Sequence, residues 1–178
     1  MDSYLNSDEY KFTQKDILEL AVKAIVHPSY GWITASLIIY GCRPKEVFSL
    51  IPYSNGEATV LEINSKSQNY KTRKVLAIPS DFVEKLNLFD QVSKPISYTN
   101  INDFNEEEVN NIMKKWLKWF MEVEQKYKIN DLRHFWAFRS IQKGIPSYLA
   151  ANSLGMSLKE FNNKYLSKKD IYKLLKNT

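Results

Sequence analysis

The segment from Ser29 to Tyr40 restricts the fold more than any other, because it is apolar on nearly all sides of a helix. A helix without a polar face is buried, so we expect this one to lie at the centre of the molecule. Its continuous apolar part, Ile33 to Tyr40, is much shorter than the roughly 18 residues that cross a bilayer, which predicts a soluble protein. Gly41 follows directly and is placed to end the helix.

Helical periodicity extends over most of the remaining chain. We expect further helices at residues 13–27, 44–50, 80–88, 106–127, 130–144, 146–153, 157–165 and 167–176. Two β-branched or apolar runs, Thr59–Ile63 and Arg73–Ile78, flank a polar connection and predict a hairpin. The sequence therefore predicts a mainly α fold with a small antiparallel β-sheet, of the α+β class.

The length of 178 residues, 44% of them apolar, is sufficient for one domain with a substantial core. Residues 1–12 are polar and lack periodicity, so we expect a flexible arm followed by a single domain over 13–178. Cys42 is the single cysteine, and the start of the chain does not resemble a secretory signal. These features predict a cytoplasmic protein, associated with the nucleoid if it is prokaryotic.

The charge balance is compatible with a polyanionic partner. Lys and Arg total 25 against 20 Asp and Glu, which gives a formal net charge of +5. The chain has four arginines, at positions 43, 73, 133 and 139, and its other basic residues are lysines. Guanidinium forms two parallel hydrogen bonds to phosphate or carboxylate, so each arginine in so lysine-rich a chain is a candidate for such a contact.

Three short segments, in their order along the chain, form a pattern that can be compared with known families. Residues 37–50 read LIIYGCRPKEVFSL, residues 130–137 read NDLRHFWA, and residues 154–157 read LGMS, with Tyr165 nine residues after Met156. These resemble, respectively, the L-x-x-x-G-x-R-x-x-E-x-x-x-L, H-x-L-R-H and L-G-H-S motifs of the tyrosine recombinases, the phage-integrase family. The resemblance extends from Thr13 to about Leu175. It implies the catalytic-domain fold of that family, without the N-terminal DNA-clamping domain that members typically carry.

The resemblance also implies a site and a reaction. Arg43 and Arg133 would clamp the scissile phosphate, Tyr165 would attack it to give a 3′-phosphotyrosine, and Lys66 in the hairpin connection would protonate the departing 5′-oxygen. Chemically, two guanidiniums can stabilise the charge that grows on the non-bridging oxygens, and a phenol requires local activation. Glu46 lies three residues after Arg43, on the same helix face, where it could orient Arg43 or Lys66.

Two positions depart from the family pattern. Asn130 replaces a histidine and cannot exchange a proton near neutral pH, and Met156 replaces a histidine or tryptophan and donates no hydrogen bond to phosphate. We interpret Asn130 as a helix N-cap and Met156 as core packing. His134 lies about 100° around the helix from Arg133, so we interpret it, together with His27, Cys42 and Arg139, as structural.

Other lysines flank the proposed phosphate site. Candidate contacts to the DNA backbone are Lys71, Arg73, Lys74, Lys164 and Lys168. The expected partners are duplex DNA and further copies of the chain in a tetramer, with no membrane, cofactor or metal. A catalytically silent DNA-binding module and a type IB topoisomerase remain alternatives. The target site, the direction of recombination, and whether Tyr165 acts in its own subunit stay open.

Overall fold

A computed structural model describes residues 14–62, 71–89, 94, 96, 104–125 and 127–166. Its elements are α1 (Gln14–Ala24), α2 (Gly31–Tyr40), the 3-10 helix η1 (Pro44–Ser49), β1 (Ile51–Pro52), β2 (Glu57–Glu62), β3 (Lys71–Leu76), α3 (Phe82–Lys85), α4 (Glu106–Val123), α5 (Ile129–Gln142), α6 (Ser147–Ser153), α7 (Leu158–Phe161) and the π-helical turn η4 (Asn162–Leu166). The predicted mainly α fold with a small antiparallel sheet is confirmed. The expected arm at 1–12 and the expected last helix at 167–176 lie outside the described residues.

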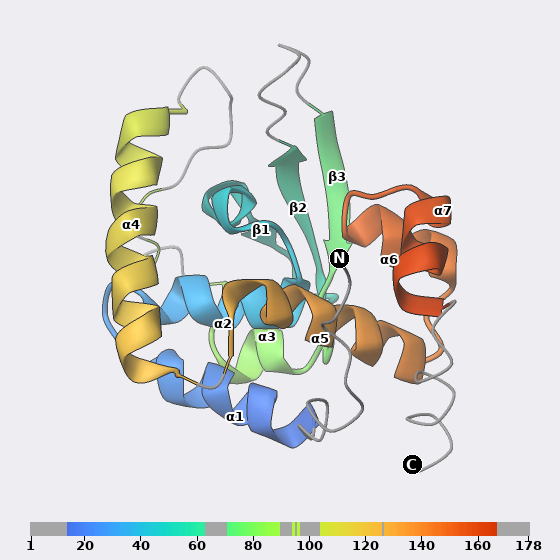
Figure 1. Ribbon diagram of the computed structural model, residues 1–178, viewed down its shortest axis with the longest axis horizontal. Helices are drawn as coiled ribbons and strands as arrows, with labels where there is room; N and C mark the ends of the chain where they lie inside the picture. Colours follow the sequence, from blue (N-terminus) through green and yellow to red (C-terminus); the bar gives the residue numbers. More distant parts are fainter. Residues whose placement is uncertain are drawn as a thin grey trace, which may run out of the picture.

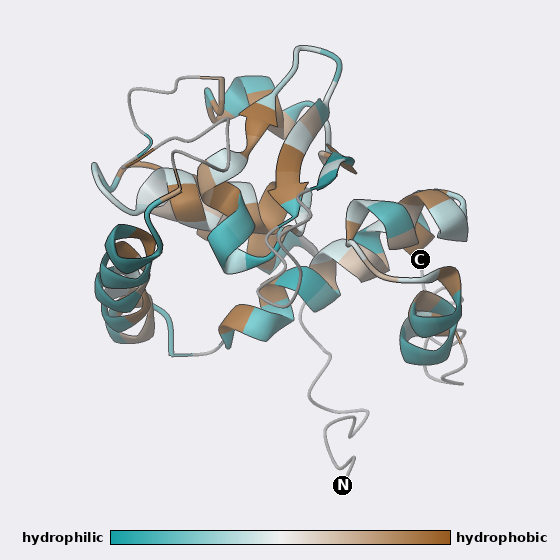
Figure 2. Ribbon diagram, turned by 90° about the horizontal axis from the view of Figure 1, so that it is seen from above, coloured by the Kyte–Doolittle hydropathy of each residue, from teal (hydrophilic) through white to brown (hydrophobic). Residues whose placement is uncertain are grey.

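Helix α2 is the centre of the molecule, as its sequence predicts. All ten of its residues are buried, and α1, α5 and η1 pack against it. Figure 1 shows α5 crossing α2, with α4 standing at one end of this pair and α6 and α7 at the other. Figure 2 shows hydrophobic residues concentrated in the middle of the molecule, whereas the outer side of α4 is hydrophilic.

Three buried tryptophans connect this core to its surroundings. Each indole N–H donates a hydrogen bond: Trp32 to the carbonyl of Leu88, Trp116 to the hydroxyl of Thr34, and Trp136 to the carbonyl of Leu76. Because a buried indole N–H without an acceptor is costly, these bonds set the positions of α4 and α5 relative to α2 and β3. None of the described helices is long and apolar enough to cross a membrane.

The sheet has three strands in the order β1-β2-β3, and both pairings are antiparallel. The predicted hairpin is confirmed as β2 and β3, with Glu57 opposite Leu76 and Glu62 opposite Lys71. Both strands begin two residues earlier than their apolar runs suggest, because the backbone ladder also includes Glu57 and Ala58 opposite Leu76 and Val75, and Lys71 and Thr72 opposite Glu62 and Leu61. The sheet lies between η1, which contacts β2, and α6, which contacts β3.

Candidate active site

Arg43 occupies the turn between α2 and η1, as the sequence predicts. It precedes Pro44, the first residue of η1, and its backbone is extended. The carboxylate of Glu46 accepts hydrogen bonds from both the backbone N–H of Arg43, at 2.7 Å, and its Nη1, at 2.9 Å. The predicted orienting role of Glu46 toward Arg43 therefore matches the geometry. The Arg43 side chain is still 49% exposed, so part of the guanidinium faces solvent.

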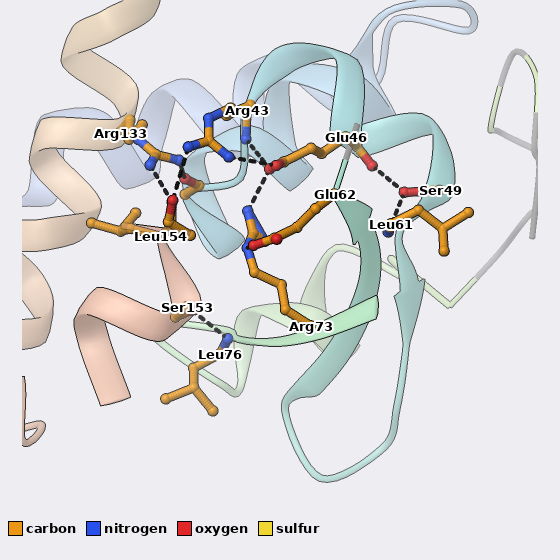
Figure 3. A network of polar contacts seen from close by, with 12 residues as sticks. Arg43, Glu46, Ser49, Leu61, Glu62, Arg73, Leu76, Arg133, Ser153 and Leu154 are labelled. Carbon is orange, nitrogen blue, oxygen red and sulfur yellow. Dashed lines mark hydrogen bonds and ion pairs between the residues drawn. The ribbon is translucent and has the colours of Figure 1, made fainter. Parts of the chain in front are cut away.

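The side chain of Arg133 extends from α5 toward the turn that also binds Arg43. Its Nη1 donates to the carbonyl of Gly41 at 3.0 Å, and its Nη2 donates to the carbonyl of Leu154. The Nη2 of Arg43 donates to the next carbonyl, that of Gly155, at 2.8 Å. Two arginines that are 90 positions apart in the chain thus converge on consecutive carbonyls of one turn, as Figure 3 shows for Arg133 and Leu154 beside Arg43.

The pKa of Arg133 reflects its burial and the charge of the neighbouring Arg43. Burial lowers the pKa of Arg133 from its ordinary value, and the neighbouring positive charge of Arg43 lowers this pKa further. Glu46 and Tyr165 act on the pKa of Arg133 in the opposite direction. Two guanidiniums held side by side repel each other, so an anion bound between them would be strongly favoured.

Arg73 completes a buried network with the two glutamates of this region. Its Nη2 lies 2.5 Å from the carboxylate of Glu46, and its Nε lies 3.1 Å from Glu62. Its side chain is 2% exposed. The predicted contact of Arg73 with the DNA backbone is wrong for this arrangement, because the guanidinium is enclosed by carboxylates. Lys71 and Lys74 on the same strand are exposed, as a phosphate contact requires.

The turn at Leu154 and Gly155 lies directly on this network. Gly155 has φ of +60°, and a Cβ added to it would lie 2.6 Å from Arg73 Nε, 3.0 Å from Glu62 Oε1 and 3.1 Å from Arg43 Nη1. Two features therefore favour glycine at this position: the left-handed backbone conformation and the close approach of three charged groups, which leaves no room for a Cβ.

Tyr165 lies in η4 and is 1% exposed. Its Oη is 3.0 Å from Nδ1 of His134, and its ring also packs against Phe138 and Phe161. The interpretation of His134 as structural missed this contact, because η4 places Tyr165 against the side of α5 that carries His134 and Phe138. His134 and Phe138 are four residues apart and therefore lie on the same face of α5, which indicates that one packing partner can contact both side chains.

The two substituted positions have different surroundings. Asn130 is exposed in the first turn of α5 and lines a cavity of about 640 Å³ between α4 and α5, together with Phe120, Met121 and Ile129. The interpretation of Asn130 as the N-cap is wrong, because the helix begins at Ile129 after Lys128, whose N–H donates to Asp131 at 2.8 Å.

Met156 is half-buried and packs against the apolar cluster that contains Tyr165, in agreement with its interpretation as core packing. Lys164 is exposed, and its Nζ lies 5.6 Å from the centre of the Tyr165 ring. Lys66 and Lys168 lie outside the described residues.

Arg139, Cys42 and His27 have structural surroundings, as predicted. Arg139 is buried and donates to the carbonyls of Ile78, at 2.9 Å, and Ile38. Burial lowers the pKa of Arg139 to about 9 and raises the pKa of the Cys42 thiol to about 12. His27 Nδ1 accepts hydrogen bonds from the backbone N–H groups of Ser29 and Tyr30.

Comparison with known proteins gives two sequence relatives. The chain is 27% identical over 143 residues to Excisase A and 29% identical over 147 residues to Excisase C, both from Nostoc sp. (strain PCC 7120 / SAG 25.82 / UTEX 2576). Each match covers 76% of this chain but only 30% and 28% of the respective relative. The chain thus spans less than a third of the length of these proteins. No protein-family model matches the sequence.

The fold has solved counterparts. XerH site-specific recombinase bound to palindromic difH substrate, in a post-cleavage complex, matches with a TM-score of 0.50 and 19% identity over 93% of this chain and 50% of that chain. The pre-cleavage complex of XerH with difH matches with the same TM-score and identity over 95% of this chain and 53% of that chain. The shared fold and the two sequence relatives together relate this chain to the tyrosine recombinase family of site-specific recombinases.

Proposed function

We propose that this chain is the catalytic part of a site-specific DNA recombinase that breaks and rejoins strands through a 3′-phosphotyrosine. One observation carries the proposal: Arg43 and Arg133 converge on the carbonyls of Gly155 and Leu154, and the Tyr165 hydroxyl is hydrogen-bonded to His134, the residue next to Arg133 on α5. An anion clamp and a phenolic nucleophile are the two components that strand cleavage by a tyrosine requires.

The two arginines act on the phosphate. Each guanidinium carries five N–H donors, and the bonds to Glu46 and to backbone carbonyls use only some of them. The remaining donors can bind non-bridging oxygens as negative charge grows on them. Because Glu46 holds Arg43 from both its backbone and its side chain, the guanidinium loses little freedom when phosphate binds.

The covalent step balances as a displacement at phosphorus. A bond forms between Tyr165 Oη and phosphorus, and the bond from phosphorus to the 5′-oxygen breaks. We assign to Lys66 the donation of a proton to that oxygen. Because the bond energy is kept in the phosphotyrosine, the 5′-hydroxyl of another strand can reverse the step. The names of the relatives, Excisase A and Excisase C, favour excision as the overall direction.

The test uses the 178-residue chain and a pool of nicked duplex oligonucleotides tiled across the DNA that flanks its reading frame. Loss of the short fragment beyond the nick traps any covalent adduct, which a denaturing gel detects. We expect an adduct with the wild-type chain and none with Tyr165→Phe. We expect Arg43→Ala and Arg133→Ala each to lower the rate by about 10²–10³-fold.

Tyr40→Phe is the matched control. Tyr40 is buried, and burial raises its pKa well above the ordinary value, so its hydroxyl does not ionise. Adduct formation by Tyr40→Phe should equal that of the wild type. Binding to the same oligonucleotides without any adduct would contradict the proposal. That result would favour a DNA-binding module, for which the apolar packing of Met156 is the supporting observation.

A further inference from the structure

Tyr165 and His134, which stands at the last position of the H-x-L-R-H motif, form a pair whose contact was not predicted from the sequence. His134 Nδ1 lies 3.0 Å from Tyr165 Oη, and the two rings meet edge to face with their centroids 5.7 Å apart. The histidine is on α5, directly after Arg133, and the tyrosine is on η4. A distance of about 2.6–3.2 Å between a nucleophile and a neighbouring base is the geometry of an activated nucleophile.

We propose that His134 is the general base that accepts the proton of Tyr165 as this residue attacks phosphate. The inference rests on the proposed function and adds the proton acceptor to it. In the neutral imidazole with its proton on Nε2, Nδ1 accepts the hydrogen bond from Oη. As the bond from Oη to phosphorus forms, the proton passes to Nδ1 and gives an imidazolium. When the strand is rejoined, Oη leaves phosphorus and takes the same proton back.

The other groups around the pair are unsuited to this task. Two charged groups of the described residues act on Tyr165, Arg133 on α5 and Lys164 on η4, and both are cations. A cation stabilises a phenolate but has no free site for its proton. Asn130, at the position where the family has histidine, has an amide that does not exchange a proton near neutral pH. His134 thus supplies proton chemistry that Asn130 lacks.

Burial of Tyr165 is consistent with this role. Tyr165 is 1% exposed and its ring lies between Phe138 and Phe161, so bulk water has little access to take the proton. A phenol has an ordinary pKa near 10 and ionises too rarely at pH 7 for rapid attack. Histidine, with an ordinary pKa of about 6.5, is a base that is mainly neutral at pH 7 and still accepts a proton readily.

The test measures single-turnover cleavage of the nicked substrate as a function of pH. In the wild-type chain we expect the logarithm of the rate to rise with pH and level off above the ordinary histidine pKa. His134→Asn keeps a hydrogen-bonding group near the position of Nδ1 but cannot carry the proton. We expect this variant to lose about 10²-fold or more in rate, and its pH dependence through this range to disappear. DNA binding should change less than twofold.

The chain contains two histidines, so His27→Asn is a matched control. His27 Nδ1 accepts two backbone hydrogen bonds, a task that an asparagine oxygen can perform. This variant should retain both the rate and the pH profile of the wild type. Phe138→Leu, which alters the packing against Tyr165 but leaves the His134 side chain in place, should lower the rate far less than His134→Asn.

A substrate with sulfur in place of the bridging 5′-oxygen separates the base from the acid. A thiolate leaves without a proton, so this substrate should not rescue His134→Asn if His134 acts on the nucleophile. Rescue would overturn the assignment, as would a wild-type rate and pH profile in His134→Asn. If this variant fails to fold, as judged by its melting curve, His134→Gln serves in its place. If wild-type chain gives no adduct that depends on Tyr165, the proposed function fails and the assignment fails with it.

Discussion

Replacement of Gly155 by alanine should disrupt the network beneath the arginine site. The new Cβ would lie 2.6 Å from Arg73 Nε. The Arg73 guanidinium cannot move freely, because Glu46 holds its Nη2 at 2.5 Å and Glu62 holds its Nε at 3.1 Å. Alanine at φ of +60° costs about 1 kcal/mol in backbone strain. Loss of one buried hydrogen bond to a charged group adds about 2 kcal/mol. We therefore expect Gly155→Ala to lower the free energy of unfolding by about 3 kcal/mol.

Gly144 provides a matched control for this prediction. It has φ of +69°, and a Cβ added to it would meet nothing within 4 Å. Gly144→Ala thus carries the backbone strain without the clash, and we expect a loss of about 1 kcal/mol. In a chain of this size each kcal/mol corresponds to roughly 2–4 °C in Tm. Calorimetry should therefore give a decrease in Tm about three times larger for Gly155→Ala than for Gly144→Ala.

A double-mutant cycle tests the assigned cause. Arg73→Met removes the nitrogen that the new Cβ would meet, so part of the cost of Gly155→Ala should disappear in the double variant. We expect a coupling of about 1 kcal/mol or more between the two substitutions. Equal losses for Gly155→Ala and Gly144→Ala, or additivity of Gly155→Ala with Arg73→Met, would refute the reasoning.

Three further predictions concern charged residues. Glu46→Gln should lower the free energy of unfolding by about 3 kcal/mol, because it leaves the 2% exposed Arg73 guanidinium with one carboxylate fewer; urea denaturation measures this. Lys74→Met should reduce the slope of log Kd against log salt by about 0.9, whereas Arg73→Met should leave this slope unchanged, as filter binding at several salt concentrations can show. Burial lowers the pKa of Lys94 from 10.5 to about 8, so the unfolded chain binds more protons between these pH values and stability should rise with pH. The rise in the free energy of unfolding over this pH range, roughly 3 kcal/mol, should be missing in Lys94→Met. If the free energies of unfolding of wild type and Lys94→Met changed in parallel with pH, the prediction would be wrong.

Much of the fold could be predicted from local patterns. The apolar run of α2 predicted that this helix is buried, whatever the arrangement of the other elements. Gly41 ends α2 and Pro44 begins η1, which predicted that Arg43 lies on the turn between them. The spacing of Glu46 three residues after Arg43 predicted their contact, which involves only one turn of chain. The alternation of side chains along β3 could also have predicted the burial of Arg73. Arg73 points to the same face of the sheet as the fully buried Val75, and the exposed Lys74 points to the other face.

The site depended on contacts between distant segments. Periodicity gives the angle of His134 around α5 but not which element covers that side, and the answer came from η4, 31 positions further along the chain. The sequence by itself determined most of the helices, the hairpin of β2 and β3, the burial of α2 and the order of the motifs. Only the tertiary structure decided that Arg73 is enclosed by Glu46 and Glu62 and that His134 lies against Tyr165, because such contacts depend on the packing of the whole chain and not on the preferences of neighbouring residues.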